Sequence, residues 1–347
     1  MTAARRPTAF LALALALALA LAAAAALLRA APAGAAPPPA CGAVRIAAMT
    51  WGSAEVMASI DRFVLRHGFG CDAVLVPGDT MSTFASMTAR GEPDVAPEVF
   101  VNQFRDELGE AADRGRIAFG AKVLSDGSQE GFWIPRYLAD AHPEIRTLGD
   151  ALARPELFAA AGAPGEGVLH NCPLGWGCQI MVENLFRANR AAEKGFRLAS
   201  SESGDALDGS IARAFAERRG WIGYYWSPTG VLARYPMTRL AFDVPFDRRE
   251  WLRCTTRPEC ADPRPNAWTP ADVYTLVSHR FERAAPAAMR YLSVRSWRNE
   301  TVNRVLLWKE ENEADGEAAA LHFLRSYPSV WRAWLPPDAA ERVGRAL

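Results

Sequence analysis

Residues 44–76 read VRIAAMTWGSAEVMASIDRFVLRHGFGCDAVLV, and this stretch decides the predicted fold. Val44–Met49 is a short apolar run typical of a strand, Ala54–His67 has the spacing of an amphipathic helix, and Cys71–Val76 is a second strand. A strand, a helix and a strand in this order predict a βαβ unit with a parallel sheet covered by helices on both faces.

The alternation continues along the chain. Further predicted elements are helices at Thr80–Arg90, Gln179–Asn189, Pro286–Leu292, Asn299–Glu311 and Asp315–Tyr327, and strands at Asp94–Val99, Gly131–Pro135, Trp221–Tyr225 and Tyr274–Val277. The pattern predicts an α/β protein of two lobes, with lobe 1 formed by 36–121 and 244–347 and lobe 2 by 122–243. Hinge crossings are expected near Gly120–Val123 and Phe242–Pro245. Both hinged binding proteins and two-domain enzymes have this layout.

Composition excludes some classes of protein. Half of the 347 residues are hydrophobic, which argues against a disordered chain. The 39 basic and 39 acidic residues give no net charge, which argues against a nucleic-acid binder.

The first 35 residues have the layout of a secretory signal peptide. Arg5 and Arg6 precede an almost unbroken Leu/Ala run, and Ala33 and Ala35 fit a cleavage site. Cleavage after Ala35 or Ala36 is expected to release a mildly acidic protein into the periplasm. The alternative is an uncleaved membrane anchor, since the run approaches the length of a membrane span.

Export indicates that the six cysteines form disulfides. Cys172 and Cys178 enclose five residues, as do Cys254 and Cys260, and both loops contain turn-forming residues. By elimination Cys41 then pairs with Cys71, although six cysteines allow 15 connectivities. A zinc site that recruits His170 beside Cys172 is a weaker alternative, because no C-x-x-C or H-x-x-x-H spacing occurs.

No common catalytic motif is present. The chain lacks a G-x-S-x-G elbow, an H-E-x-x-H pair, a phosphate-binding loop and a G-x-G-x-x-G turn. The five histidines are scattered at positions 67, 142, 170, 279 and 322, and a lone histidine is more often a surface or core residue than a catalyst. Nothing in the sequence nominates a nucleophile together with its base, so no catalytic residue is predicted; an enzyme remains an alternative at this point.

Aromatic residues beside turns are the most informative feature. Trp176 lies between two glycines in Cys172–Cys178, where the backbone N–H groups of Gly177 and Cys178 would begin a helix and favour an anion. Trp226 lies where a strand runs into a turn, and Phe100 ends a strand in the first lobe. Several aromatic faces around one cavity suit a quaternary ammonium group, which is attracted to a π-face and donates no hydrogen bond.

CPLGWGC at 172–178, YYWSP at 224–228 and VPF at 244–246 resemble the periplasmic glycine betaine-binding proteins of ABC transporters. The resemblance covers nearly the whole mature chain. It implies a two-lobe periplasmic binding protein fold of type II, with hinge strands between the lobes. It also implies a cage of Trp176 and Trp226 around a trimethylammonium group, with the ligand carboxylate held by the backbone N–H groups of Gly177 and Cys178.

The sequence departs from that family in lobe 1. Phe100 stands where a cage tryptophan is usual, and Phe104 stands where a carboxylate-contacting histidine is expected. Choline-type binders of the wider family pair the aromatic box with an acidic residue, a role for which Glu98 and Glu55 are candidates. Trp51 is a candidate for a further wall.

The predicted function is capture of glycine betaine or a related quaternary ammonium compound and its delivery to the permease subunits of an ABC importer. No cofactor, metal or nucleic acid is expected, and the protein is expected to be a monomer. The alternatives are a receptor for choline, carnitine or another amine, and a sensor subunit without transport.

Overall fold

A computed structural model describes residues 41–160 and 165–347. The predicted signal peptide, 1–35, lies outside the described residues. Among the helices that are described, none is both long enough and apolar enough to cross a membrane.

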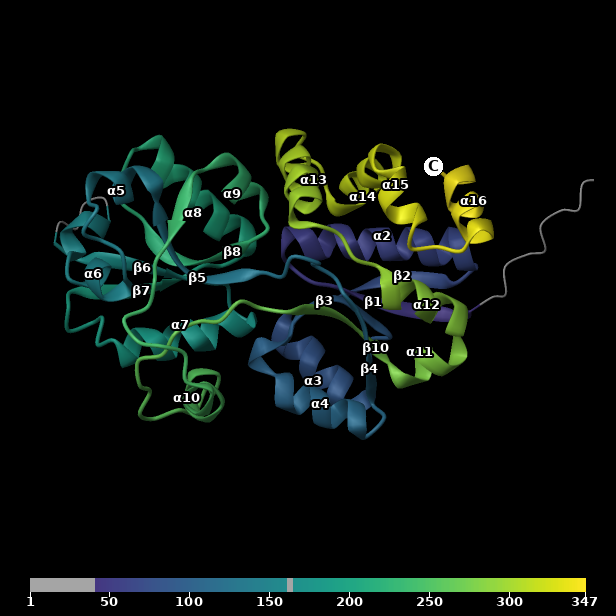
Figure 1. The fold of residues 1–347 in the computed structure, drawn as a ribbon, viewed down its shortest axis with the longest axis horizontal. Helices are drawn as coiled ribbons and strands as arrows, with labels where there is room; N and C mark the ends of the chain where they lie inside the picture. Colours follow the sequence, from purple (N-terminus) through teal and green to yellow (C-terminus); the bar gives the residue numbers. More distant parts are fainter. Residues whose placement is uncertain (1–40, 161–164) are drawn as a thin grey trace, which may run out of the picture. The chain divides into compact units, whose positions relative to one another are not determined.

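Five strands form the first sheet in the order β2-β1-β3-β10-β4 (Figure 1). Its strands are β1 (Ala43–Ala48), β2 (Asp72–Pro77), β3 (Val95–Phe100), β4 (Ile117–Lys122) and β10 (Val273–Ser278). The helical elements of this lobe are α2 (Gly52–Phe69), α3 (Thr80–Arg90), η1 (Val101–Gln103), α4 (Arg105–Asp113), α11 (His279–Ala284), α12 (Pro286–Val294), α13 (Asn299–Glu311), α14 (Gly316–Ser326), α15 (Pro328–Arg332) and α16 (Pro337–Arg345).

The second sheet has the order β7-β6-β8-β5-β9. Its strands are β5 (Gln129–Pro135), β6 (Gly167–Asn171), β7 (Phe196–Ser200), β8 (Ile222–Ser227) and β9 (Met237–Arg239). The helical elements beside it are α5 (Arg136–Ala141), α6 (Leu148–Leu152), η2 (Pro155–Phe158), α7 (Gly177–Ala188), α8 (Gly204–Ala216), α9 (Gly230–Arg234), α10 (Arg248–Glu250) and η3 (Trp251–Thr255).

Both sheets are mixed, so the expectation of parallel sheets is corrected. β1 pairs in parallel with β2 and β3, but β10 runs antiparallel to β3 and β4. In the second sheet β5 runs antiparallel to β8 and β9. The reason is the connectivity: β5 and β10 are the first strands after the chain passes from one sheet to the other, and they do not follow a right-handed crossover helix.

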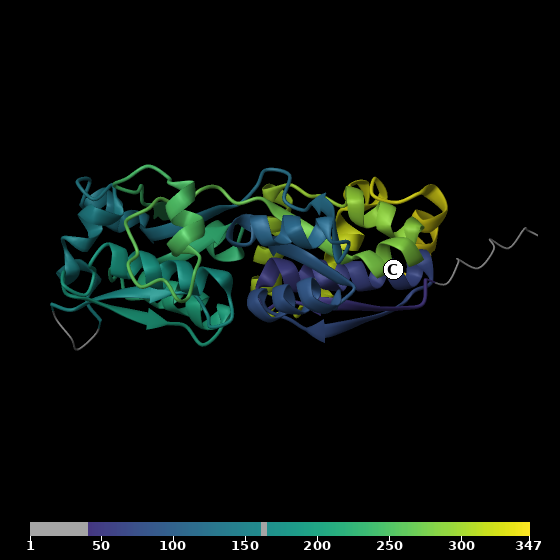
Figure 2. The same ribbon diagram turned by 90° about the horizontal axis from the view of Figure 1, so that it is seen from below.

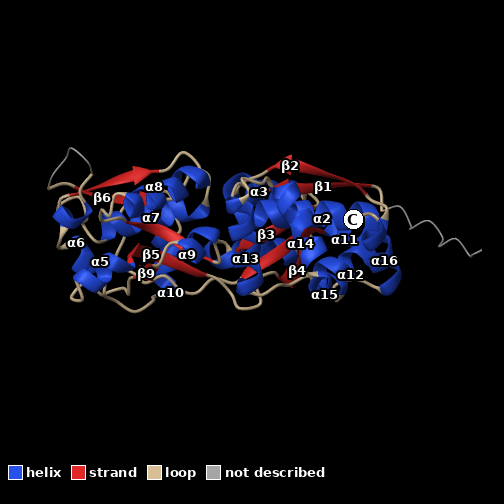
Figure 3. Cartoon of the chain, turned by 90° about the horizontal axis from the view of Figure 1, so that it is seen from above, coloured by secondary structure: helices blue, strands red, loops and turns tan. Residues whose placement is uncertain are grey.

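Helices cover both faces of the first sheet. α2 packs on β1 and β2 and is itself covered by α14 and α16, which lie beside it in Figure 3. α3 and α4 lie on the opposite side of the sheet (Figure 1). The two segments that link the sheets pair with each other: Ser128 and Ala271 exchange two backbone hydrogen bonds of 2.9 Å. Both segments can be followed between the sheets in Figure 2.

The cysteines form the three expected pairs, Cys41–Cys71, Cys172–Cys178 and Cys254–Cys260. The last pair closes a loop that packs on α7, since the side-chain amide of Asn184 donates to the carbonyls of Cys254, Thr255 and Arg257. The same segment also reaches the first lobe, since Arg257 pairs with Glu107 of α4 at 2.6 Å and the indole N–H of Trp251 donates to the carbonyl of Asn102 over 3.0 Å.

Candidate functional site

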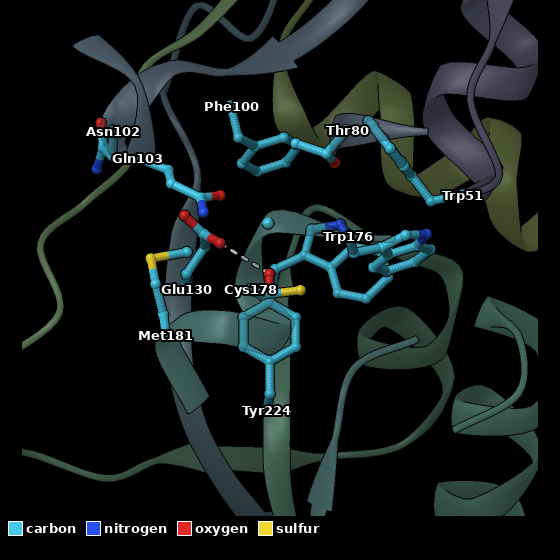
Figure 4. A pocket seen from close by; sticks show the side chains of 12 residues that line it. Trp51, Thr80, Phe100, Asn102, Gln103, Glu130, Trp176, Cys178, Met181 and Tyr224 are labelled. Atoms are coloured by element: carbon cyan, nitrogen blue, oxygen red, sulfur yellow. Dashed lines mark hydrogen bonds between the residues drawn. The ribbon is translucent and has the colours of Figure 1, made fainter. Parts of the chain in front are cut away.

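One cavity collects most of the aromatic residues that the sequence singles out. It encloses about 440 Å³, its open mouth included, and Figure 4 shows its lining from close by. The lining residues are Trp51, Thr80, Phe100, Asn102, Gln103, Glu130, Trp176, Gly177, Cys178, Met181, Tyr224 and Trp226. They come from both sheets and from the helices that begin beside them.

Four aromatic rings form the wall of this cavity. The centroids of Trp51 and Trp176 lie 5.5 Å apart with planes at 73°, and those of Trp176 and Trp226 lie 5.3 Å apart at 79°. Phe100 meets Trp51 edge to face at 6.0 Å. Edge-to-face contacts hold each ring against its neighbour and leave the π-faces at an angle to one another. The four residues are the ones that the sequence analysis proposes for the cage.

Two tryptophans occupy equivalent places in the fold. Trp51 is the residue before α2 and Trp176 is the residue before α7, and each is followed by a glycine that begins the helix. The indole N–H of Trp176 donates to Thr50 Oγ1 over 2.8 Å, which joins α7 to the loop after β1. The hydrogen bond fixes the ring where it lines the cavity.

Glu98 does not line the cavity; it supports Trp51 from behind. Its Oε1 accepts from the indole N–H of Trp51 over 2.8 Å and from the hydroxyl of Ser53 over 2.6 Å. Glu98 is fully buried, and this burial raises the pKa of its carboxyl. The structure therefore places Glu98 behind Trp51 and not at the surface of the cavity.

The acidic residue that lines the cavity is Glu130. It belongs to β5, directly opposite Trp226 of β8. Side chains two residues apart on a strand share a face, so Tyr224 and Trp226 point to the same side. The hydroxyl of Tyr224 donates to Glu130 Oε1 over 2.7 Å (Figure 4). Burial raises the pKa of Glu130 to about 7.

Gln103 brings a second polar group to the same place. It follows Phe100 in the short turn η1, is 4% exposed, and has no hydrogen-bond partner for either amide atom within the described part of the protein. A Cβ on Gly177 would lie 1.7 Å from Gln103 Oε1. Because Gly177 has no side chain, the amide of Gln103 can lie over the N-terminus of α7.

Two other candidates lie elsewhere. Phe104, at the expected histidine position, is buried and stacks on Phe84 with 4.0 Å between the centroids. Glu55 accepts from the backbone N–H of Gly316 over 2.8 Å and pairs with Lys309 at 3.2 Å. Neither lines the cavity.

Sequence reasoning missed Glu130, Gln103 and Tyr224. The alternation along β8 was the available signal for Tyr224, since it is two residues from Trp226. Nothing local marks Glu130, because its partner in the cavity is 94 residues away.

The zinc alternative does not fit the structure. Cys172 and Cys178 are joined to each other, and His170 stacks on Trp221 at 5.3 Å. Over 41–160 and 165–347, no group of three or more potential metal-ligating residues comes together.

The family model for the substrate-binding domain of ABC-type glycine betaine transport systems matches residues 42–326. Three solved structures share the fold. A choline-binding protein of an ABC transporter, in complex with choline, superposes with a TM-score of 0.69 at 17% identity, covering 88% of this chain and 98% of the other. A glycine betaine/L-proline-binding protein from Borrelia burgdorferi gives a TM-score of 0.66 at 16% identity, with 87% and 99% covered.

Lactococcal OpuAC in its closed conformation with glycine betaine is also similar. Its TM-score is 0.63 at 16% identity, and the superposition covers 85% of this chain and 100% of the other. These likenesses support the two-lobe binding-protein fold of type II. Because the family model matches most of this chain, the chain belongs to the family of substrate-binding domains of ABC-type glycine betaine transport systems.

Proposed function

We propose that the protein captures a quaternary ammonium compound between its lobes and delivers it to the permease subunits of an ABC importer. The observation that carries this proposal is the meeting of Trp51, Trp176, Trp226 and Phe100 around one cavity. A quaternary ammonium group cannot donate a hydrogen bond, and aromatic faces within about 6 Å attract it when water is excluded.

The remaining residues orient the other end of the ligand. Gly177 and Cys178 line the cavity at the first turn of α7, where free backbone N–H groups favour a carboxylate. This arrangement suits glycine betaine. Glu130 in the same cavity, and a phenylalanine at position 104, favour choline or another amine without a carboxylate as the second candidate.

Ligand binding is proposed to close a hinge. The lobes are taken as 36–121 with 244–347 and as 122–243. The loop around Cys254 contacts both, because Asn184 donates to its carbonyls and Arg257 pairs with Glu107 at 2.6 Å. A ligand that touches Phe100 and Trp51 on one side and Trp176 and Trp226 on the other would stabilise the closed form.

The predicted signal peptide supports a location in the periplasm. We propose a periplasmic, monomeric protein that is released by cleavage of the signal peptide and performs no catalysis. A sensor subunit would bind the same ligand but pass it to no permease, so reconstituted uptake with the cognate permease separates the two roles.

Isothermal titration with glycine betaine and choline tests the proposal, with tryptophan fluorescence followed in parallel. Trp176→Ala is expected to weaken binding at least tenfold, on the order of the loss of one desolvated cation–π contact. The matched control is Trp308→Ala, since Trp308 stacks on His322 and does not line the cavity. Unchanged affinity in Trp176→Ala, or no binding of either ligand below millimolar concentration, contradicts the proposal.

A further inference from the structure

We propose that Glu130 determines which ligand the cavity accepts, through its protonation state. Ionised, it selects a quaternary ammonium compound whose other end is neutral, such as an alcohol. Protonated, it admits a zwitterion whose other end is a carboxylate. The inference rests on the proposed function, because it assumes that the aromatic cage holds the ammonium group.

The position of Glu130 is the first argument. Among the described residues that line the cavity, it is the one with an ionisable carboxylate, and it lies in register with Trp226 across β5 and β8. A ligand ammonium group on Trp226 therefore lies in the same small enclosure as this carboxyl. An ionised carboxylate in a desolvated cavity attracts a cation much more strongly than it does in water.

The second argument is the N-terminus of α7, which favours an anion in the same cavity as Glu130. This helix has 12 residues, and its first two, Gly177 and Cys178, line the cavity. Its N-terminus favours an anion, so a betaine carboxylate belongs there. A ligand carboxylate and an ionised Glu130 in one desolvated cavity repel each other, and one of the two is then expected to be protonated.

Gln103 allows both binding modes. Its buried amide is unpartnered in the described part of the chain and lies over Gly177. Figure 4 draws it with Glu130 on the side of the cavity away from Trp51. An amide can turn its oxygen toward a ligand hydroxyl or its NH₂ group toward a ligand carboxylate, so the same residue serves either class.

The groups around Glu130 leave it free to titrate near neutrality. Burial raises its pKa to about 7. Tyr224 has its own pKa raised well above 10 by burial and stays a neutral donor. Arg239 contacts the backbone carbonyl of Glu130, at 3.4 Å, rather than its carboxyl. Cys178 is held in a disulfide and does not titrate.

The test is isothermal titration of the full protein with choline and with glycine betaine at pH 6 and pH 8, in buffers of different ionisation enthalpy. If only one form of Glu130 is competent for each ligand, a pKa near 7 makes choline binding about tenfold tighter and betaine binding about tenfold weaker at the higher pH. Choline binding is expected to release a proton near neutrality, and betaine binding to take one up.

Glu130→Gln fixes this side chain in a neutral form. Both affinities are then expected to lose their dependence on pH, with choline held at its weak value and betaine at its strong one. The matched control is Asp208→Asn, because Asp208 is a buried carboxyl whose pKa is also raised to about 7 but which does not line the cavity. This variant is expected to keep the wild-type pH dependence.

Binding of either ligand without proton exchange, or a pH dependence that persists in Glu130→Gln, overturns the inference and leaves the proposed function standing. No binding of either ligand at either pH overturns both. If Glu130→Gln fails to fold, the number of protons that the wild-type protein releases or takes up on binding each ligand still tests the inference.

Discussion

The indole N–H of Trp51 and the hydroxyl of Ser53 donate to the same oxygen of Glu98, over 2.8 and 2.6 Å. Trp51 is the residue directly before α2, and Glu98 lies near the end of β3. A buried carboxylate therefore fixes the angle at which one wall of the cage faces the cavity.

Replacing Glu98 by alanine is expected to leave the buried indole N–H unsatisfied and to lower the free energy of unfolding by about 1–3 kcal/mol. Ligand affinity is expected to fall with it, because the Trp51 ring loses its orientation. Glu98→Gln keeps an acceptor oxygen at the same place and is expected to stay near the wild type. Denaturant unfolding and titration of all three proteins test this, and an alanine variant with unchanged stability and affinity contradicts it.

Gly177→Ala is expected to displace Gln103, since the added Cβ would lie 1.7 Å from Oε1. The amide is then forced into the cavity, so affinity for the ligand is expected to drop by at least an order of magnitude. Gly109→Ala is the control, because a Cβ at that helical glycine meets nothing within 4 Å. The same clash is expected to lower the thermal stability of Gly177→Ala. Adding Gln103→Ala removes the clash and is expected to restore that stability; failure to do so would show that the clash lies elsewhere.

The two short disulfide loops allow a matched comparison. Cys172–Cys178 and Cys254–Cys260 have the same sequence separation, 6. Replacing either pair by alanine is expected to cost about 2 kcal/mol of stability, from the extra entropy of the unfolded chain. Only the first pair is expected to weaken ligand binding, since that loop positions Trp176. Equal affinities in the two double variants would contradict this role.

The pKa of Glu130, about 7 in the folded protein, also predicts a dependence of stability on pH without ligand. An unfolded Glu has a pKa near 4.3, so the folded state binds more protons between pH 4 and 7 and loses stability as pH rises through that window. Thermal unfolding at several pH values is expected to show a smaller loss in Glu130→Gln than in the wild type. If the melting temperature depends on pH equally in both proteins, Glu130 is not the group responsible for this pH dependence.

How much of this could be predicted from the sequence depends on how far each contact reaches along the chain. The βαβ start and the helices Thr80–Arg90 and Asn299–Glu311 follow from local periodicity, and the structure has both helices over these residues. The aromatic candidates stand out because turns and glycines surround them. The antiparallel entry of β5 and β10 is not local, since it depends on where the chain crosses between the sheets.

The polar residues of the cavity could not be predicted from the sequence, because their contacts also join distant parts of the chain. In the sequence, Glu98 is a candidate ligand contact because choline-type binders of the wider family pair the aromatic box with an acidic residue. The structure instead uses it to hold Trp51, a partner 47 residues away. Glu130 and Gln103 become functional candidates only when the second sheet brings α7 and β8 to the first lobe.

The central claim is that the cage recognises a positive charge through aromatic faces, and a comparison of choline with its neutral carbon isostere, 3,3-dimethylbutan-1-ol, tests it most directly. The two molecules have nearly the same shape, so apolar burial is matched. With two or three desolvated cation–π contacts worth about 1–2 kcal/mol each, titration is expected to show at least about 30-fold tighter binding of choline. Equal affinities for the charged and the neutral ligand would contradict the claim.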